Sequence, residues 1–440
     1  MQRNTLKRLL VTALGAIAVI NASVYFQDTT ALVVLACFVY VAICARLYKF
    51  DYLHPSVAYL VPWMMILSFS VVPLSKYSRP MNVATYELLL ATIFAWLFGC
   101  VSANPEDLTR LATVQSDHRD LTDLRPNFKI VVIAAFMGLY MFAALNIAVA
   151  GYVPLLSLLT TGDSRYLDFG IPSVYGAFLA YANAVGCVAF YVYLRTKRTS
   201  YLLWFLSVLV MHVTLVTRQN IITLLVEIFV IRCLTLKRLS RFTMVLSLSA
   251  ALGAFSLLGT LRSGDVKEIF GIQQDYMWVP TSFIWLYAYS YFNALNIDNT
   301  ITQSGAPFFD GFMWQTLLPS LLRPQSNHET YLEVTSAAAS SYIYPVYIDI
   351  GKGVVAWTGV LGFATAAAYR RALRRRRFLD VATYGCLFSC ALLSFFTDFW
   401  LYLPVSFQLI FFWVFQRLLF LPHPARSTNA LLPQLAGRSE

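Results

Sequence analysis

The chain has 440 residues, of which 58% are hydrophobic, 15% aromatic and only 12% charged, and its formal net charge is +11. Globular domains carry about 25% charged residues, so a chain with half that share has too little polar surface to cover itself in water. The composition excludes a soluble protein of this size and predicts an all-α, polytopic integral membrane protein.

Twelve apolar stretches are each long enough to cross a bilayer as a helix, which takes roughly 17 to 25 residues. In chain order, the expected spans lie at 8–25, 30–48, 56–74, 84–102, 129–150, 173–194, 200–216, 219–236, 242–261, 346–368, 380–397 and 400–420. The first is interpreted as a retained helix rather than a signal peptide, because no small-residue cleavage site follows it. The predicted organisation is a membrane segment at 1–261, an outer loop at 262–345, a membrane segment at 346–420 and a tail at 421–440.

The distribution of positive charge sets the predicted orientation, because cytoplasmic loops of membrane proteins are enriched in Lys and Arg. With both termini in the cytoplasm, 25 of the 33 Lys and Arg fall on the cytoplasmic side and eight on the outer side. The basic run at Arg370–Arg377 is explained most simply as part of this topology pattern. Nucleic-acid binding is therefore not expected.

Two outer loops are long for connections between neighbouring helices, at 151–172 and 262–345. The second contains an aromatic stretch, 276–296, that is apolar enough to be a further span. A crossing there would move Arg370–Arg377 to the outer face. The stretch is therefore interpreted as an interfacial or re-entrant helix, rich in the Trp and Tyr that settle at headgroup depth. An amphipathic segment at 308–322 is interpreted in the same way.

Outer arginines are informative because positive charge on that side works against insertion. The candidates are Arg165, Arg218, Arg262 and Arg323. A guanidinium binds phosphate oxygens bidentately and stays charged, so several at one membrane surface suit a lipid-linked diphosphate. The alternative for each is anchoring to lipid headgroups or pairing with an acidic residue of the outer loops.

The surroundings of two of these arginines form a pattern. Thr217–Asn220 precedes an apolar helix, and a second apolar helix ends at Gly259–Arg262. Tyr347–Gly351 leads into the glycine-containing stretch Trp357–Gly362. Together these segments resemble the bacterial oligosaccharide repeat-unit polymerases, the Wzy-type O-antigen polymerases.

The 151–172 loop adds to this resemblance. Ten residues separate Arg165 from Gly176, which matches the RX10G pattern of periplasmic loops in such polymerases. The large loop departs from the pattern, because Val334 stands where a glycine would follow Arg323 at that spacing.

The resemblance implies a GT-C-like membrane glycosyltransferase of the bacterial inner membrane. Its substrate would be an undecaprenyl-diphosphate-linked oligosaccharide, and its product O-antigen or another surface polysaccharide made at the periplasmic face. Membrane lipid surrounds such a protein, and a chain-length regulator and a flippase are the further partners that the resemblance suggests. Two alternatives stay open: an O-antigen ligase that transfers the glycan to lipid A core, and a polysaccharide or lipid-linked sugar transporter.

Within this mechanism, Arg218 and Arg262 are expected to hold the donor diphosphate, while Arg165 and Arg323 guide the donor or acceptor. Asp349, at the outer mouth of a predicted span, or His328, in the large loop, would assist the acceptor hydroxyl. The alternatives are a salt bridge for Asp349 and a solvated position for His328.

The aromatic stretch at 276–296, with Tyr289, is a candidate surface for stacking on sugar rings, with membrane anchoring as the alternative. Glu227 and His212 fall inside predicted spans and are interpreted as hydrogen-bonding to each other between neighbouring helices, with a proton path as the alternative. The sequence contains no P-loop, HExxH, GxSxG or Rossmann signature and no zinc-type cysteine spacing, so neither a cofactor nor a metal is expected.

Overall fold

The structure is a computed structural model. It describes residues 11, 15, 17–18, 30–47, 51–103, 124–163, 165–166, 168–236, 253, 256–257, 259–260, 264–305, 307–319, 322–324, 331–334 and 341–421. Over these residues the chain is helical, with two isolated β-bridges and no strand. The prediction of an all-α protein is confirmed for this part of the chain.

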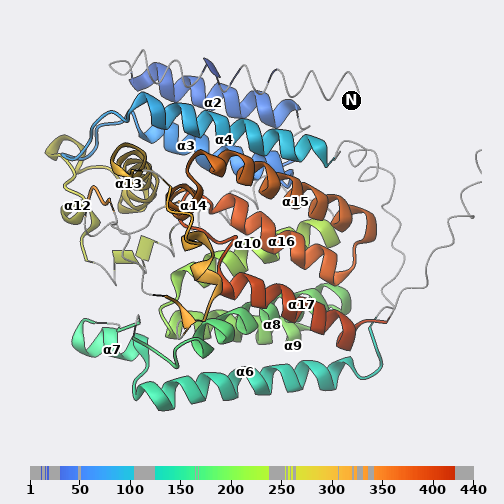
Figure 1. Cartoon of the computed structure of the whole chain (residues 1–440). Coiled ribbons are helices and arrows are strands. Elements are labelled where there is room, and N and C mark those ends of the chain that lie inside the picture. The colour runs from blue at the N-terminus through green and yellow to red at the C-terminus, as the bar shows by residue number, and fades with distance from the viewer. Residues whose placement is uncertain are drawn as a thin grey trace, which may run out of the picture.

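The longer helices are α2 (Thr30–Leu47), α3 (Pro55–Phe69), α4 (Val83–Ser102), α6 (Phe128–Ala150), α8 (Val174–Thr196), α9 (Thr199–Thr214), α10 (Arg218–Thr235), α13 (Thr281–Gln303), α15 (Val354–Arg375), α16 (Phe378–Leu392) and α17 (Leu403–Leu419). Shorter segments are α7 (Pro154–Thr161), α12 (Val266–Ile269), η1 (Gln274–Tyr276), η2 (Phe312–Leu317), α14 (Ile343–Ile350) and η4 (Gly351–Gly353). Except for α13, the longer helices run side by side as a bundle (Figure 1).

Among the described residues, four segments are long and apolar enough to cross a membrane: α4, α6, α8 and the stretch Ile343–Arg375. Other apolar helices, among them α3, α9, α16 and α17, are shorter. Several apolar helices of this kind indicate a membrane protein. The predicted spans at 8–25 and 242–261 lie almost entirely outside the described residues, and the number of twelve crossings stays a prediction.

Burial separates the central helices of the bundle from the peripheral ones. In the most apolar 18-residue stretch of α8, 83% of the residues are buried, whereas in the corresponding stretch of α6 only 28% are buried. Apart from Lys129 in the first turn, the exposed residues of α6 are apolar or aromatic, such as Met137 and Met141. Exposed apolar side chains along one long helix are what contact with lipid tails requires.

The α4–α15 pair packs closely because glycines line its interface. A methyl group on Gly99 of α4 would overlap the carbonyl oxygen of Gly359, and one on Gly362 of α15 would lie 2.5 Å from that of Trp96. Small residues let two helix backbones approach, which is the main way helices pack in lipid.

We expect Gly99→Ala to lower the free energy of unfolding by about 1–3 kcal/mol, because the added methyl group forces the two backbones apart. Thermal unfolding in detergent measures this loss. Gly176→Ala is the matched control, since its methyl group would meet Pro404 Cγ at an ordinary 3.7 Å. Equal melting temperatures for the two variants would contradict the close approach of α4 and α15.

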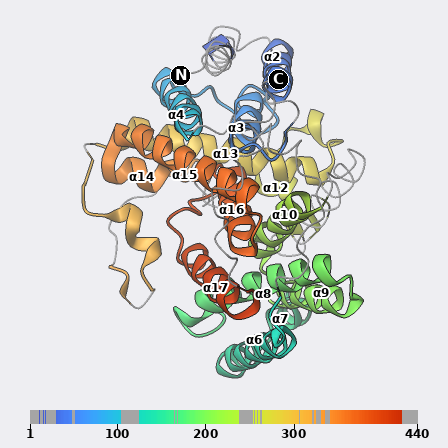
Figure 2. The same cartoon turned by 90° about the vertical axis from the view of Figure 1, so that its right-hand side faces the viewer.

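The aromatic stretch predicted at 276–296 forms α13, which lies across one end of the bundle (Figures 1 and 2). Most of its side chains from Ile284 to Thr300 are buried. Residues 70–82 cover it: the hydroxyl of Tyr287 donates to the carbonyl of Val72 at 3.2 Å. The side chains of α13 therefore pack mainly against protein, whereas Trp278, just before the helix, is 78% exposed.

The span predicted at 346–368 differs from the structure at both ends. Its first residues belong to α14, which stops where Gly351 takes a positive φ of 56°. The helix resumes as α15 and continues to Arg375, so four arginines of the basic run lie on its last turns. Arg376, with φ 50°, ends it.

Candidate functional site

Arg218 is the first residue of α10, and the turn before it is held in a constrained conformation. Val216 has a φ of 56°, which a β-branched residue rarely adopts. The hydroxyl of Thr217 donates to the carbonyl oxygen of His212 at 3.2 Å and lies 3.0 Å from the Nδ1 atom of that histidine. These contacts fix the residue at which α10 begins and with it the position of Arg218.

The guanidinium of Arg218 lies against two aromatic residues of α13. Its Nη2 atom donates to the hydroxyl of Tyr289 at 3.4 Å, and its Cζ atom lies 5.4 Å from the ring centre of Trp285. These two rings stack on each other with centres 5.7 Å apart. Arg218 and Tyr289, both predicted site residues, are thus brought together.

Burial and helix geometry give this cluster its electrostatic character. Arg218 is only 7% exposed. A methyl group on Gly259 would lie 2.8 Å from both Arg218 Nη1 and Trp285 Cε2, so this position needs a glycine. The start of α10 also carries the positive end of the helix dipole. A buried cation, a helix N-terminus and two aromatic faces together suit an anion joined to a ring or a lipid.

The other two predicted site arginines that the structure describes, Arg165 and Arg323, lie away from this cluster. Arg165 is exposed in the loop after α7, with its guanidinium 5.9 Å from the ring centre of Tyr152. Arg323 donates to the carbonyls of Gln315 and Leu318 at 3.1 and 3.4 Å, at the end of η2. Within the described residues, no contact joins either of them to Arg218.

The remaining predicted site residues have varied surroundings. Asp349 is 2% exposed, and its Oδ1 atom accepts the N–H of Gly311 at 2.9 Å, which holds the turn before η2. Gly176, near the start of α8, makes only ordinary contacts. Arg262 and His328 lie outside the described residues.

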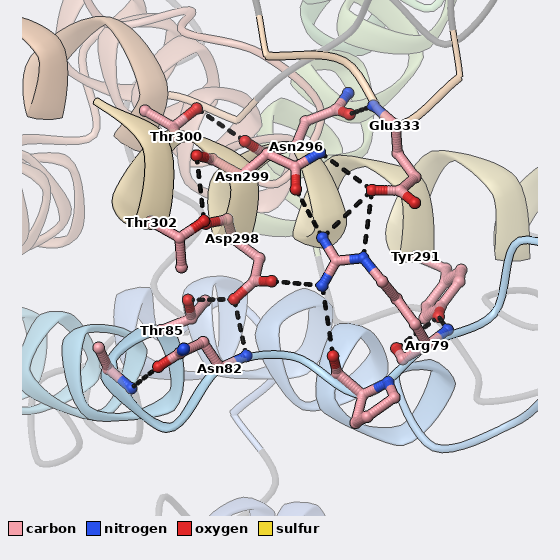
Figure 3. A network of polar contacts seen from close by, with 12 residues as sticks. Arg79, Asn82, Thr85, Tyr291, Asn296, Asp298, Asn299, Thr300, Thr302 and Glu333 are labelled. Carbon is pink, nitrogen blue, oxygen red and sulfur yellow. Dashed lines mark hydrogen bonds and ion pairs between the residues drawn. The ribbon is translucent and has the colours of Figure 1, made fainter. Parts of the chain in front are cut away.

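A polar cluster around Arg79 was not predicted as a site (Figure 3). The Nη1 atom of Arg79 donates to Asp298 at 2.6 Å and to the carbonyl of Pro80 at 3.3 Å. Its Nη2 atom donates to Asn299 at 2.6 Å and to Glu333 at 3.1 Å, and its Nε atom to Glu333 at 3.2 Å. These bonds engage all five N–H groups of the guanidinium.

The same cluster joins three segments of the chain. Asp298, on α13 and 2% exposed, also accepts the N–H of Asn82 at 2.8 Å and the hydroxyl of Thr85 at 2.5 Å. Desolvation lowers the pKa of Arg79, but the hydrogen bonds and charges of Asp298 and Glu333 outweigh it and raise that pKa above its ordinary value. The ion pairs therefore keep Arg79 charged.

A pocket of about 600 Å³ opens beside this cluster and is lined by Arg79, Asn82, Asn299, Gln303 and Glu333 among others. Because the Arg79 guanidinium is fully engaged and two carboxylates surround it, the pocket carries one excess negative charge. It therefore disfavours a phosphate and suits a neutral, hydroxyl-bearing ligand. The sequence did contain a sign of it, since Asp298 and Asn299 end an otherwise aromatic stretch.

The predicted hydrogen bonding between Glu227 and His212 is wrong, because Glu227 is hydrogen-bonded to two other helices. Its Oε2 atom accepts from Cys187 of α8 at 3.2 Å and from Gln408 of α17 at 2.6 Å. His212 instead pairs with Thr217 on the following turn. In the described part of the chain, no group of three or more His, Cys, Asp or Glu is placed to hold a metal ion.

No protein-family model matches this chain, and neither does any curated protein or solved structure.

Proposed function

We propose that this protein polymerises undecaprenyl-diphosphate-linked oligosaccharide repeat units into O-antigen or another surface polysaccharide at the periplasmic face of the bacterial inner membrane. The observation that carries the proposal is the buried guanidinium of Arg218 at the start of α10, against Trp285 and Tyr289. This arrangement offers a diphosphate a fixed positive charge and offers the attached sugar or lipid two aromatic faces.

The proposed topology has twelve spans and cytoplasmic termini, and a difference between the two ends of the bundle supports the proposed orientation. The short segments α7 and α12 lie at the same end as α13 (Figure 1). At the opposite end, Arg370 of α15 donates to the carbonyl of Ala103 after α4 at 3.4 Å, and Arg125 donates its N–H to Leu419 of α17 at 2.9 Å. This second end holds most of the described Lys and Arg, as a cytoplasmic face would.

The chemistry asked of the protein is modest, because the anomeric carbon already carries a diphosphate leaving group. The protein has to hold the donor, orient the acceptor and stabilise the charge that develops on the diphosphate. Arg218 and the first turn of α10 supply that stabilisation, and the pocket beside Arg79 offers polar partners to a hydroxyl-bearing glycan.

Reconstitution of the purified protein into liposomes with lipid-linked repeat units tests the proposal. We expect a ladder of lipid-linked oligomers on gel electrophoresis without any added protein. Transfer only after lipid A core is added would identify a ligase. Movement of intact substrate across the bilayer without elongation would identify a transporter, and either result would overturn the polymerase proposal.

A further inference from the structure

Asp398 is a buried carboxylate on the turn between α16 and α17, and half of its hydrogen-bonding capacity is unused. Its Oδ1 atom accepts the N–H groups of Trp400 at 2.9 Å and Leu401 at 3.2 Å. The residue is 8% exposed, and its Oδ2 atom meets no hydrogen-bond donor in the described part of the chain. A buried polar atom without a partner is costly, so its presence in a native fold calls for an explanation.

This turn borders the Arg218 cluster. The ring of Phe396 lies edge-on to that of Tyr289, with centres 4.8 Å apart, and Tyr289 accepts a hydrogen bond from Arg218. Asn293, one turn further along α13, donates to the carbonyl of Phe395 at 3.0 Å. The segment that carries Asp398 is therefore attached to the region of α13 that faces the proposed diphosphate site.

Two buried donors near the turn are also without partners. The indole Nε1 atoms of Trp400 and Trp357 meet no acceptor among the described residues. Trp400 belongs to the turn itself, and the ring of Trp357 lies 5.6 Å from that of Trp314 in η2. The hydroxyl of Thr316, also in η2, donates to the carbonyl of Leu401. One carboxylate acceptor and two N–H donors among aromatic rings suit the hydroxyls and apolar face of a sugar.

We propose that Asp398 Oδ2 accepts a hydrogen bond from the attacking hydroxyl of the acceptor sugar and takes its proton during glycosyl transfer. This role rests on the proposed polymerase function. As the acceptor oxygen forms its bond to the anomeric carbon, its proton passes to Oδ2. The bond from that carbon to the diphosphate oxygen breaks, and its electron pair stays on the leaving diphosphate. Asp398 then releases the proton to water.

Of Asp398 and the titratable group that interacts with it in the described part of the chain, the carboxyl of Asp398 is the one that titrates near neutrality. Tyr342, at the start of α14, interacts electrostatically with Asp398 and stays neutral there, because burial raises its pKa above the ordinary value near 10. Burial raises the pKa of Asp398 to about 6, although the N–H groups of Leu401 and Trp400 lower it. Asp398 is therefore ready to accept a proton above pH 6.

Asp398→Asn tests this role in the liposome assay across pH 4.5–8. We expect the wild-type rate to fall about tenfold per pH unit below a midpoint near pH 6, because the protonated acid cannot accept a proton. The variant should elongate at least about 100-fold more slowly and lack that acid limb. Its melting temperature should match wild type, since an asparagine keeps the oxygen that accepts from Trp400 and Leu401. Asp168→Asn, on an exposed outer loop, is the matched control.

The outcomes separate this role from the polymerase function. Wild type that elongates, with an Asp398→Asn variant equally fast and the same acid limb, would overturn the role of Asp398 alone. Wild type that never elongates would overturn the function. If Asp398→Asn fails to fold, Trp400→Phe decides, because it keeps the backbone N–H but removes the indole donor. It should raise the KM for the acceptor several-fold with little change in kcat, and an unchanged KM would count against the subsite.

Discussion

Arg218→Ala is expected to lower the rate of polymer elongation by about 10²–10³-fold, the effect of removing one group that stabilises developing charge. The loss should appear mainly in kcat, because the charge on the leaving diphosphate grows as the glycosidic bond breaks. Elongation by the purified variant in liposomes measures this effect. In a polymerase-null strain, the same variant should give no polysaccharide ladder.

Two further variants show whether the loss belongs to this guanidinium. Arg218→Lys keeps the charge but loses the bidentate fork and its stacking on Trp285, so we expect it to restore only part of the rate. Arg198→Ala removes an exposed arginine that precedes α9 and lies outside the cluster, and its effect should be within a few-fold. Full-length polysaccharide from Arg218→Ala would contradict the proposed diphosphate site.

Hydrophobicity and charge predicted much of the helix layout, because lipid forces the backbone of each crossing segment into a continuous helix. The stretches at 84–102 and 129–150 correspond closely to α4 and α6. The break at Gly351 was missed, since a single glycine with positive φ interrupts no apolar run. The transverse course of α13 follows from its packing under residues 70–82, and hydropathy does not report such packing.

The candidate site was likewise predicted from the sequence only in part. Arg218 was singled out because a cation on the outer side is costly and its residue type binds phosphate. Its partner Trp285 belongs to the stretch predicted as a candidate surface for stacking on sugar rings, but the sequence did not place it beside Arg218. The Arg79 cluster was missed because its ion pairs join residues more than 200 positions apart. The sequence did not point to Asp398. Its Oδ2 atom is without a hydrogen-bond donor in the described part of the chain because of how one short turn is buried, and a sequence does not show this.

Arg79→Met is expected to lower the free energy of unfolding by about 3 kcal/mol, the lower end of the cost of removing one partner of a buried ion pair. Asp298, with a side chain 2% exposed, would lose its cation, and the Arg79 side chain is itself 34% exposed, which moderates the loss. Thermal unfolding in detergent measures the change. Arg323→Met is the matched control: it removes an exposed arginine that donates to backbone carbonyls, so the expected change is within about 0.5 kcal/mol.

The contrast with Arg218 makes this prediction informative about function. All five N–H groups of Arg79 are engaged by protein, so its removal should act through the anchoring of α13 to the segment before α4. In folded protein at low temperature, Arg79→Met should therefore retain far more elongation activity than Arg218→Ala. A variant that melts like wild type yet cannot elongate would contradict this expectation. It would place Arg79 at the diphosphate, where its guanidinium could not keep the partners that it has in this structure.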